Sequence, residues 1–493
     1  MTDTARFVRV LARKDVLALA FGAMIGWGWV VMTGHWITTA GSLGAVLAFI
    51  VGGLAIVCVG LTYAELAAAM PEAGGEHVYS YRGLGHFASF VCTWSIVLGY
   101  MTVVAFEAVA LPTVIENLAP GYAVGHLWTV AGFEVKATWV AVAVIGSLVM
   151  MSINYVGVRT AALVQKLVTL LIAVVGVMFF TGALFTGSES NLVPLFTGEP
   201  SMAAGALSVL IMVPFMFVGF DVIPQAAEEI DLPHRDIGRL LIVSVVLAVV
   251  WYAAMIFGTA YVLSAAGIDP DGLAVPQAMA AAFGASWAGK LMVLAGMAGI
   301  VTSWNAFYIG GSRAIYALAR AGMLPAIFAR LHPKHRTPYV AILAIGLVST
   351  IAPFFGRSTA VWLVDAGGLG IVIAYLFVAA SFIVLRLREP NMPRPFRTSG
   401  GITLGVIAIV LSLAIIALYL PMSPSALKPV EWLLFAIWMG VGLALYVWAR
   451  MRYGLEPARR LGQTHADTAP EPIVVQSVVG NLPERRAARS VWA

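Results

Sequence analysis

Two glycine-containing stretches lie within long apolar runs of this chain, and they carry groups that can bind a small ion or zwitterion. Residues 22–28 read GAMIGWG, and residues 217–221 read FVGFD. Inside lipid an unpaired backbone group is costly, so a helix opens at this depth only where it lines a protected cavity. Glycine lacks the Cβ that would keep a ligand away from the backbone. An opened helix offers amides that attract an anion and carbonyls that attract a cation.

The two stretches together predict a binding site. We expect amides around Gly28 to hold a carboxylate, and carbonyls at Met24, Ile25 and residues 217–219 to hold an ammonium group. A second interpretation is close helix packing, because the first two glycines match the spacing of small-xxx-small motifs. Packing alone explains neither the third glycine nor the second opening. The predicted substrate-binding residues are Met24, Ile25, Gly26, Trp27, Gly28, Glu107, Phe217, Val218, Gly219, Phe220 and Asp221.

Ionisable side chains inside a membrane are costly and mark candidate functional sites. Asp221, in the second opening, is predicted to hold a substrate amine or a proton, or to cap the half-helix that follows. Glu107 is predicted to be a second cation site or a proton acceptor, or to make a structural hydrogen bond. Asp365 is expected toward the outside, as a gate or as a structural residue. For His35 an ordinary packed or pore-lining role is favoured over a functional one.

Aromatic side chains near the openings can close over a ligand or offer a cation–π face. Phe220 directly follows the glycine of the second opening and is a candidate gate, with packing as the alternative. Trp27 and Trp29 belong to the first opening. For Trp94 and Trp304 a packing role is favoured over gating.

Membrane helices must position these residues. Of 493 residues, 61% are hydrophobic and 11% are charged, and the mean hydropathy is +0.92. Soluble domains average about 25% charged residues, so the composition indicates a polytopic membrane protein. Cys58 and Cys92 both lie in apolar runs and indicate neither a disulfide framework nor a metal site. The first apolar run is too long for a cleavable signal peptide, so none is expected.

Twelve apolar segments have the length of membrane spans. Segments 1–5 and 6–10 are similar in total length, and because five is odd, the second group must cross the membrane in the opposite sense. The sequence therefore predicts an all-α membrane protein with an inverted 5+5 repeat, broken first and sixth helices, and two extra helices. The repeats are residues 15–187 and 203–386, and the extra helices lie in 402–452. The segments are residues 15–40, 42–69, 87–115, 137–156, 161–186, 203–227, 239–265, 288–318, 338–356, 360–386, 402–420 and 430–451.

The distribution of Lys and Arg predicts the orientation. With the N-terminus inside, 25 of the 29 Lys and Arg residues fall on the cytoplasmic side, as the positive-inside rule requires. Both termini are therefore predicted to be cytoplasmic. Residues 1–14 form a short N-terminal segment, and residues 453–493 are polar and charged, which predicts a disordered tail.

Several motifs, in order along the chain, resemble the amino acid–polyamine–organocation permease superfamily. Residues 22–28 are similar to its first-span signature G-x-M-I-G-[SA]-G. Residues 63–79 resemble Y-x-E-L…P-x-x-G-G-x-Y-x-Y, residues 219–229 resemble G-F-[DE]…A-E-E, and residues 312–325 match the stretch after span 8. Trp27 departs from the first signature, which has Ser or Ala there. A ring at this place is expected to narrow the site or to stack on a ligand.

The resemblance implies a leucine-transporter-like fold and a secondary active transporter, and matched broken helices at a repeat interface are typical of one. The expected function is amino acid import by alternating access, coupled to H⁺ or Na⁺. The alternative is a permease or exchanger of polyamines or other organocations. The expected partners are a small amine-bearing substrate and membrane lipid, without nucleic acid, in a bacterial inner membrane. The histidines show no metal-ligand spacing, so neither an enzyme nor a cofactor is expected, apart from Na⁺ as a coupling ion.

The coupling ion is left open by the sequence. The resembled fold can hold sodium between first-span carbonyls and hydroxyls of span 8, and residues 299, 302 and 303 fall on one helix face. Some proton-coupled relatives place a span-5 lysine there, but Lys166 lies nearer the cytoplasm than the matching position, which is near Ile172. The coupling-ion candidates are Gly299, Thr302, Ser303, Asp221 and Glu107, and the gate candidates are Phe220 and Asp365.

Overall fold

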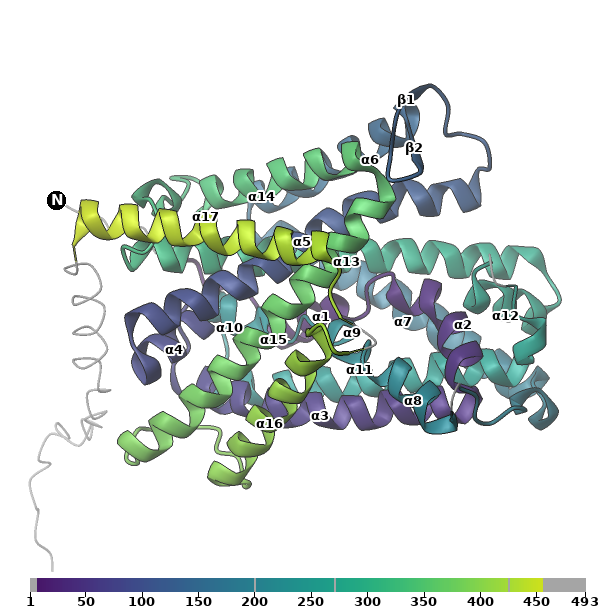
Figure 1. The fold of residues 1–493 in the computed structure, drawn as a ribbon, viewed down its shortest axis with the longest axis horizontal. Helices are drawn as coiled ribbons and strands as arrows, with labels where there is room; N and C mark the ends of the chain where they lie inside the picture. Colours follow the sequence, from purple (N-terminus) through teal and green to yellow (C-terminus); the bar gives the residue numbers. More distant parts are fainter. Residues whose placement is uncertain (1–6, 199–200, 270–271, 424–425, 455–493) are drawn as a thin grey trace, which may run out of the picture.

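The computed structural model describes residues 7–198, 201–269, 272–423 and 426–454, with 358–361 as backbone only. The predicted tail, 453–493, lies outside the described residues except for Tyr453 and Gly454. The described chain is a helical bundle with one two-stranded hairpin (Figure 1). Its helices are α1 Arg13–Met24, α2 Gly28–Ala40, α3 Ser42–Ala69, α4 Glu76–Leu84, α5 His86–Leu118, α6 Ala137–Val156, α7 Val158–Thr186, α8 Met202–Leu210, α9 Val213–Met216, α10 Val222–Gln225, α11 His234–Val262, α12 Ala274–Phe283, α13 Ser286–Arg320, α14 Tyr339–Ile351, α15 Gly356–Arg388, α16 Gly401–Tyr419 and α17 Pro429–Tyr453.

Within the described residues, nine helices are long and apolar enough to cross a bilayer, and α1 and α2 together make a tenth, bent span. Each coincides with a predicted segment. The predicted segments 203–227 and 338–356 correspond instead to shorter apolar stretches, 202–216 and 339–355. The chain is therefore an all-α multi-pass membrane protein, and the total of twelve spans stays a prediction.

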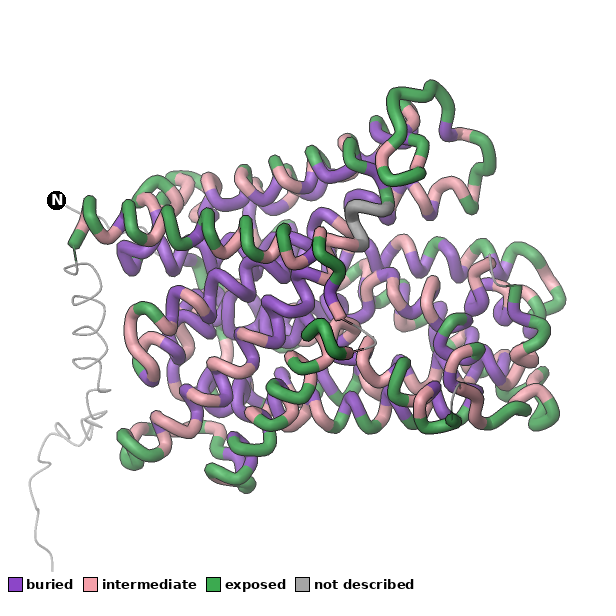
Figure 2. The backbone as a smooth tube through the Cα atoms, in the orientation of Figure 1, coloured by how far each residue is buried: buried purple, intermediate pink, exposed green. Residues whose placement is uncertain are grey.

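The core of the bundle is built around α5 and α13. The most apolar windows of these helices are 89% and 83% buried, against 22% for α16 and 11% for α17. Figure 2 shows the same contrast, with buried segments in the interior and much of α17 exposed. The apolar side chains of such peripheral helices suit contact with lipid.

The structure contains three elements between the spans that the sequence analysis did not predict. The hairpin pairs β1 (His126–Val130) with β2 (Phe133–Lys136) in antiparallel fashion. Helix α12 is a short helix before α13. Helix α4 lies between Gly75 (φ +33°) and Gly85 (φ +93°), which turn the chain at its two ends. All three are too short to span a bilayer, and the hairpin and α4 are also partly polar, so a search for bilayer-length apolar runs does not reveal them.

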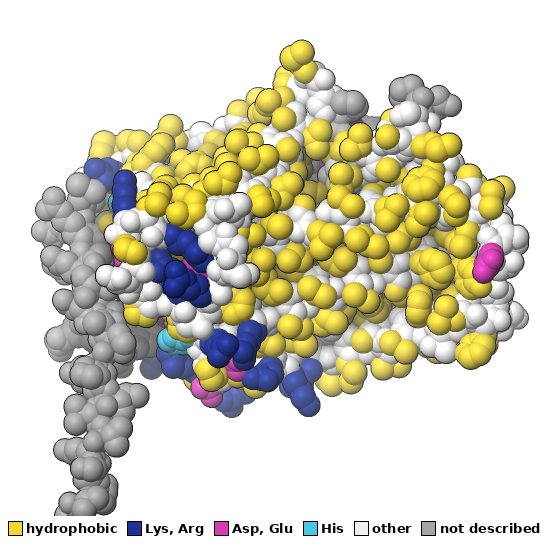
Figure 3. Space-filling view, turned by 90° about the horizontal axis from the view of Figure 1, so that it is seen from below, with side chains coloured by type: hydrophobic (Ala, Val, Ile, Leu, Met, Phe, Trp, Pro, Cys, Tyr) yellow, Lys and Arg dark blue, Asp and Glu magenta, His cyan; other side chains and the backbone are white. Residues whose placement is uncertain are grey.

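One end of the bundle carries both ends of the described chain (Figure 1) and a gathering of Lys and Arg side chains (Figure 3). We call it the inner end, and two buried ion-pair groups define it. Arg386 and Arg394 contact Glu65 at 2.5 and 3.0 Å, and Arg313 contacts Glu229 at 2.8 Å. These contacts join α3 to α15 and to the loop after α15, and they join α13 to the loop between α10 and α11.

Candidate substrate site

The first opening separates α1 from α2. Helix α1 ends at Met24, α2 begins at Gly28, and the two are bent by 45°. Helix α13 approaches the opening at Gly299, where a β-carbon would lie 2.6 Å from the carbonyl oxygen of Gly26 and 2.8 Å from that of Ile25. The carbonyls of the opening therefore face α13 at close range.

The second opening lies between α9 and α10 and is centred on Gly219. The φ angle of Gly219 is +132°, which L side chains rarely adopt, so glycine is required here. A β-carbon on Gly219 would lie 2.6 Å from the Cβ of Ala23 and 3.0 Å from the amide nitrogen of Met24. The two openings are therefore in direct contact, as the matched breaks in the sequence suggested.

A buried tyrosine joins the two broken helices. The hydroxyl of Tyr252, on α11, lies 2.9 Å from the carbonyl oxygen of Met24 and 3.2 Å from that of Met216, and donates to both. Tyr252 thus ties the end of α1 to the end of α9. The sequence analysis missed this residue, because a single tyrosine in an apolar span carries no signal of its own.

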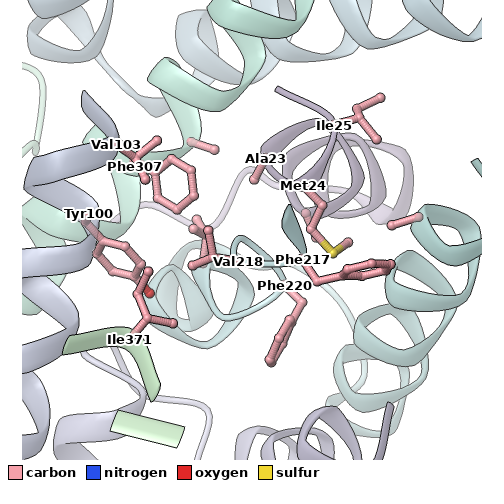
Figure 4. Packing of buried hydrophobic residues seen from close by; sticks show 14 of the residues in the cluster. Ala23, Met24, Ile25, Tyr100, Val103, Phe217, Val218, Phe220, Phe307 and Ile371 are labelled. Carbon is pink, nitrogen blue, oxygen red and sulfur yellow. The ribbon is translucent and has the colours of Figure 1, made fainter. Parts of the chain in front are cut away.

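A cavity of about 480 Å³ lies against both openings, within the size range of small-molecule sites. Figure 4 shows part of its surroundings, with Val103 and Phe307 close to Tyr100 and with Val218 between this group and Met24. The predicted residues that line the cavity are Met24, Gly26, Trp27, Gly28, Glu107, Val218, Ser303 and Asp365. Those placed outside its lining are Ile25, Phe217, Gly219, Phe220, Asp221, Gly299 and Thr302.

Asp221 is fully buried behind the second opening and does not reach the cavity. Its Oδ1 accepts a hydrogen bond from the amide of Gly219 at 2.7 Å, and its Oδ2 accepts one from the hydroxyl of Tyr100 at 2.5 Å. The carboxyl group therefore holds the opened backbone from behind. This bond runs back to Gly219, so it differs from the predicted capping of the following half-helix.

Glu107 is the predicted carboxyl side chain that lines the cavity beside the first opening. Only 3% of it is exposed, and it is hydrogen-bonded to the hydroxyl of Ser303. Its Oε1 lies 3.0 Å from the place of a β-carbon on Gly26. Its Oε2 is buried and has no hydrogen-bond partner within the described part of the chain. A carboxyl oxygen so placed can accept a hydrogen bond from a substrate ammonium group, or carry a proton.

Most of the cavity wall is apolar. Trp27 lines it, and the Trp27 ring lies against Gly296 of α13, where a β-carbon would collide with the ring. Because Gly296 has no side chain, α13 leaves room for the Trp27 ring of the first opening. Other apolar lining residues are Val31, Met32, Val103, Phe106, Met212, Phe215, Met216, Val218 and Phe307.

The last two helices contribute residues to the cavity wall. Tyr419 at the end of α16 and Lys428 and Glu431 at the start of α17 line it, together with Asp365 of α15. The backbone amide of Lys428 donates to Glu431 at 2.7 Å and fixes the start of α17. The outer location and the gating role of Asp365 stay predictions. No motif in the sequence links α16 and α17 to the site, so their part in it was missed.

The predicted sodium ligands lie on the face of α13 that meets the first opening. The hydroxyl of Thr302 donates to the carbonyl of Gly299 at 2.9 Å, and Ser303 bonds to Glu107. Lys166 contacts Asp15 at 2.9 Å and is partly exposed.

Phe220 contacts aromatic rings and does not line the cavity. Its ring centroid lies 5.3 Å from that of Tyr63 and 5.5 Å from that of Tyr375. In this conformation Phe220 is part of the packed layer behind the second opening, and its gating role stays a prediction.

The other aromatic candidates have structural contacts. Trp94 stacks on Trp438 of α17 at 4.5 Å, and the indole nitrogen of Trp304 donates to the hydroxyl of Ser349 at 3.2 Å. Neither lines the cavity, in agreement with the favoured packing role. His35 is exposed on α2 rather than packed.

Residues 11–444 match the family model of amino acid permeases. The chain is 29% identical over 449 residues to the branched-chain amino acid permease BcaP of Bacillus subtilis (strain 168), covering 89% of this chain and 92% of that protein. It is 26% identical over 443 residues to the methylthioribose transporter of the same organism, covering 89% and 92%. It is 30% identical over 352 residues to the vacuolar cationic amino acid transporter 8 of Arabidopsis thaliana, covering 70% of this chain and 58% of that protein. The family model covers most of the sequence, so the chain belongs to the amino acid permease family, whose members are transporters and not enzymes.

Proposed function

We propose that this chain imports an amino acid with an apolar side chain, together with a cation, by alternating access. The observation that carries the proposal is the cavity at the contact of the two openings, with Glu107 on an otherwise largely apolar wall. The opened backbone at Gly26 and Gly28 supplies amides for the carboxylate, and Glu107 and nearby carbonyls supply acceptors for the ammonium group. The apolar wall suits an aliphatic side chain.

We propose the inverted repeat as the basis of alternating access. Its support is the direct contact of the two openings, one in residues 15–187 and the other in residues 203–386, because inverted repeats place their broken helices at a shared interface. The Lys and Arg side chains gathered at the inner end support a cytoplasmic location of both termini. The membrane in this proposal is a bacterial inner membrane.

The coupling cation in this proposal is H⁺ or Na⁺. Glu107 is a candidate proton carrier, and the carbonyls of Ile25 and Gly26 with Thr302 and Ser303 are a candidate sodium site. Oxygen ligands of this kind suit a hard cation.

A polyamine or other organocation is the second candidate substrate. One observation favours it: Asp365 and Glu431 line the same cavity as Glu107, so an extended amine could contact carboxyl groups at both ends. The relatives themselves carry names with different substrates, so their names do not decide between the two candidates.

Transport into proteoliposomes tests the proposal. We expect the purified protein to exchange labelled L-leucine against internal L-leucine, and to accumulate it when an inward gradient of H⁺ or Na⁺ is imposed. Empty liposomes give the background. Accumulation of spermidine without L-leucine exchange would overturn the amino acid assignment and favour the second candidate.

A further inference from the structure

A second group of buried carboxyls lies behind the substrate cavity, on the side of α4. Glu76 is the first residue of α4, and it is fully buried. The side-chain amide of Gln225, in α10, donates to its Oε2. Asp221 precedes Gln225 by one helical turn, so the two side chains lie on one face of this segment. Glu76 and Asp221 are close enough to repel each other electrostatically.

The backbone holds these two segments together closely. A β-carbon on Gly75 would lie 2.8 Å from the Cβ of Pro224 and 3.3 Å from the amide nitrogen of Gln225. The amide of Gly74 donates to the carbonyl of Gln225 at 3.3 Å. The start of α4 therefore cannot move away from α10 without breaking these contacts, and Glu76 stays beside the second opening.

The surroundings of the pair contain no compensating cation. Within the described residues, no Lys or Arg is among the groups that act on either carboxyl. The buried Arg313 is engaged by Glu229 at 2.8 Å. The titratable side chains that face the pair are Tyr63 of α3, Tyr79 of α4, Cys92 and Tyr100 of α5, and Tyr375 of α15.

The same group of residues contains buried polar atoms that lack hydrogen-bond partners among the described residues. Oε1 of Gln225 is a buried acceptor that has no donor among the described residues, and the hydroxyl of Tyr63 is the group beside the Glu76 carboxyl that can donate to it. The hydroxyl of Tyr375, on a side chain that is 1% exposed, also has no hydrogen-bond partner there and interacts with Asp221. Buried acceptors without donors favour the uptake of a proton or a small cation.

Two adjacent carboxylates in a buried, cation-free site are strongly unfavourable, and the usual outcome is that one of them keeps a proton. Glu76 lies in α4, outside the membrane-spanning helices. Burial and the neighbouring Asp221 carboxyl raise the pKa of Glu76 well above its usual range.

We propose that Glu76 and Asp221 form a proton-binding carboxyl pair, separate from the substrate cavity, that carries the coupling proton. The inference rests on the proposed function, because it names H⁺ as the cation of that transport. One carboxyl group of the pair holds the proton as a carboxylic acid while the other stays a carboxylate, and the proton leaves when the pair is hydrated in an inward-open state.

Tyr100 provides the physical link between this pair and the substrate. Its hydroxyl donates to Asp221 at 2.5 Å, and its ring contacts Phe307, which lines the cavity, with 5.4 Å between centroids. A shift of the cavity wall on substrate binding therefore moves the group that stabilises Asp221. Coupling between substrate and proton follows from this shared contact.

Infrared spectroscopy of the purified protein in lipid tests the pair without relying on transport. At neutral pH we expect a C=O band of a protonated carboxyl group, shifted in D₂O, that is weaker by one carboxyl in Glu76→Gln. The control is Glu389→Gln, which removes a partly exposed carboxyl paired with Arg82, and it should leave the band unchanged. An equal band in the wild type and Glu76→Gln would overturn the proposal.

Transport of L-leucine gives the second readout. Glu76→Gln should retain exchange of internal for external L-leucine, but an acidic exterior should no longer drive accumulation above the level without a gradient. Accumulation equal to the wild type, or a wild type driven by Na⁺ and not by H⁺, would overturn the proposal. A wild type that exchanges no amino acid would instead refute the proposed function, and the infrared result would still stand.

A further variant covers the case in which Glu76→Gln does not fold. Gln225→Leu removes the amide that donates to Glu76, which disfavours the charged carboxylate. The pH at which the pair releases its proton should therefore move upward, in the infrared titration and in the pH profile of uptake. An unchanged titration would remove Glu76 and Gln225 from proton binding.

Discussion

A β-carbon on Gly26 would lie 3.0 Å from Oε1 of Glu107, so the first opening and the carboxyl group on the cavity wall meet with no room for a side chain. The Cβ of Ser303 lies 3.1 Å from the same point. The backbone of α1–α2, the carboxyl of α5 and the hydroxyl of α13 thus converge at one place on the cavity wall. The proposed substrate site depends on this convergence.

Gly26→Leu should abolish substrate binding while the protein remains folded. The leucine side chain would occupy the space between the opened backbone and Glu107. The measurement is L-leucine binding to the purified variant, with its thermal unfolding as a check of folding. Gly440→Leu is the matched control, because a β-carbon at Gly440 meets nothing within 4 Å. Normal affinity in Gly26→Leu would remove the first opening from the site.

Glu107→Gln should weaken L-leucine binding by at least about tenfold, or about 1.4 kcal/mol. Glutamine can still bond to Ser303, but it lacks the charge that attracts an ammonium group. Ser303→Ala, which leaves the charge in place, should have a smaller effect. Equal losses in the two variants would indicate that Glu107 acts through its hydrogen bond and not through its charge.

Trp27→Ala should widen the range of substrates. Removing the ring enlarges the cavity beside Gly296, so amino acids with aromatic side chains should compete better for uptake and small ones worse. Competition against labelled L-leucine measures this shift. Trp94→Ala serves as the control, because Trp94 stacks on Trp438 and does not line the cavity. The same shift in both variants would point to a loss of packing and not to the cavity wall.

Tyr252→Phe should lower both stability and L-leucine affinity. The lost hydroxyl bonds to Met24 and Met216, and a hydrogen bond of this kind contributes about 1 kcal/mol to stability. Thermal unfolding and binding of the purified variant measure the two effects. A variant with unchanged affinity would show that the link between the two broken helices does not shape the site.

Arg313→Met should destabilise the protein by about 3–5 kcal/mol, because it leaves the buried carboxyl of Glu229 without its partner. Arg82→Met removes a partly exposed pair with Glu389 and should cost about 0–1 kcal/mol. Unfolding of both variants in the same lipid or detergent gives the comparison. Similar small losses would mean that the inner end is not held by its buried pair.

The sequence predicts the spans well, because hydropathy over a bilayer-length window is a strong signal. It also locates the two openings, since Gly26, Gly28 and Gly219 lie within apolar runs, where glycine destabilises a continuous helix. The short helices α4 and α12 are not predicted from the sequence, because they lie between spans and are shorter than a bilayer-length window. The contact between the openings depends on tertiary packing, which no local pattern encodes.

The sequence identifies some ionisable residues of the site, but it does not show which of them reach the cavity. Glu107 stands out as a carboxyl in an apolar run, and the structure places it on the cavity wall. Asp221 stands out equally, but its bonds to Gly219 and Tyr100 hold it behind the opening. Glu76 was overlooked as a site residue because it lies in a polar loop sequence, and only the fold buries it against α10. Exposure of an ionisable residue is a tertiary property, and sequence alone ranks such residues poorly.

The most direct test of the central claim is thermal stabilisation of the purified protein by a panel of amino acids, polyamines and small amines. A ligand that binds the folded state raises its stability with the logarithm of ligand concentration. We expect L-leucine and similar aliphatic amino acids to stabilise the wild type and the Gly440→Leu control, and to have no effect on Gly26→Leu. Stabilisation by polyamines alone, or equal stabilisation of Gly26→Leu by L-leucine, would contradict an amino acid site at the contact of the two openings.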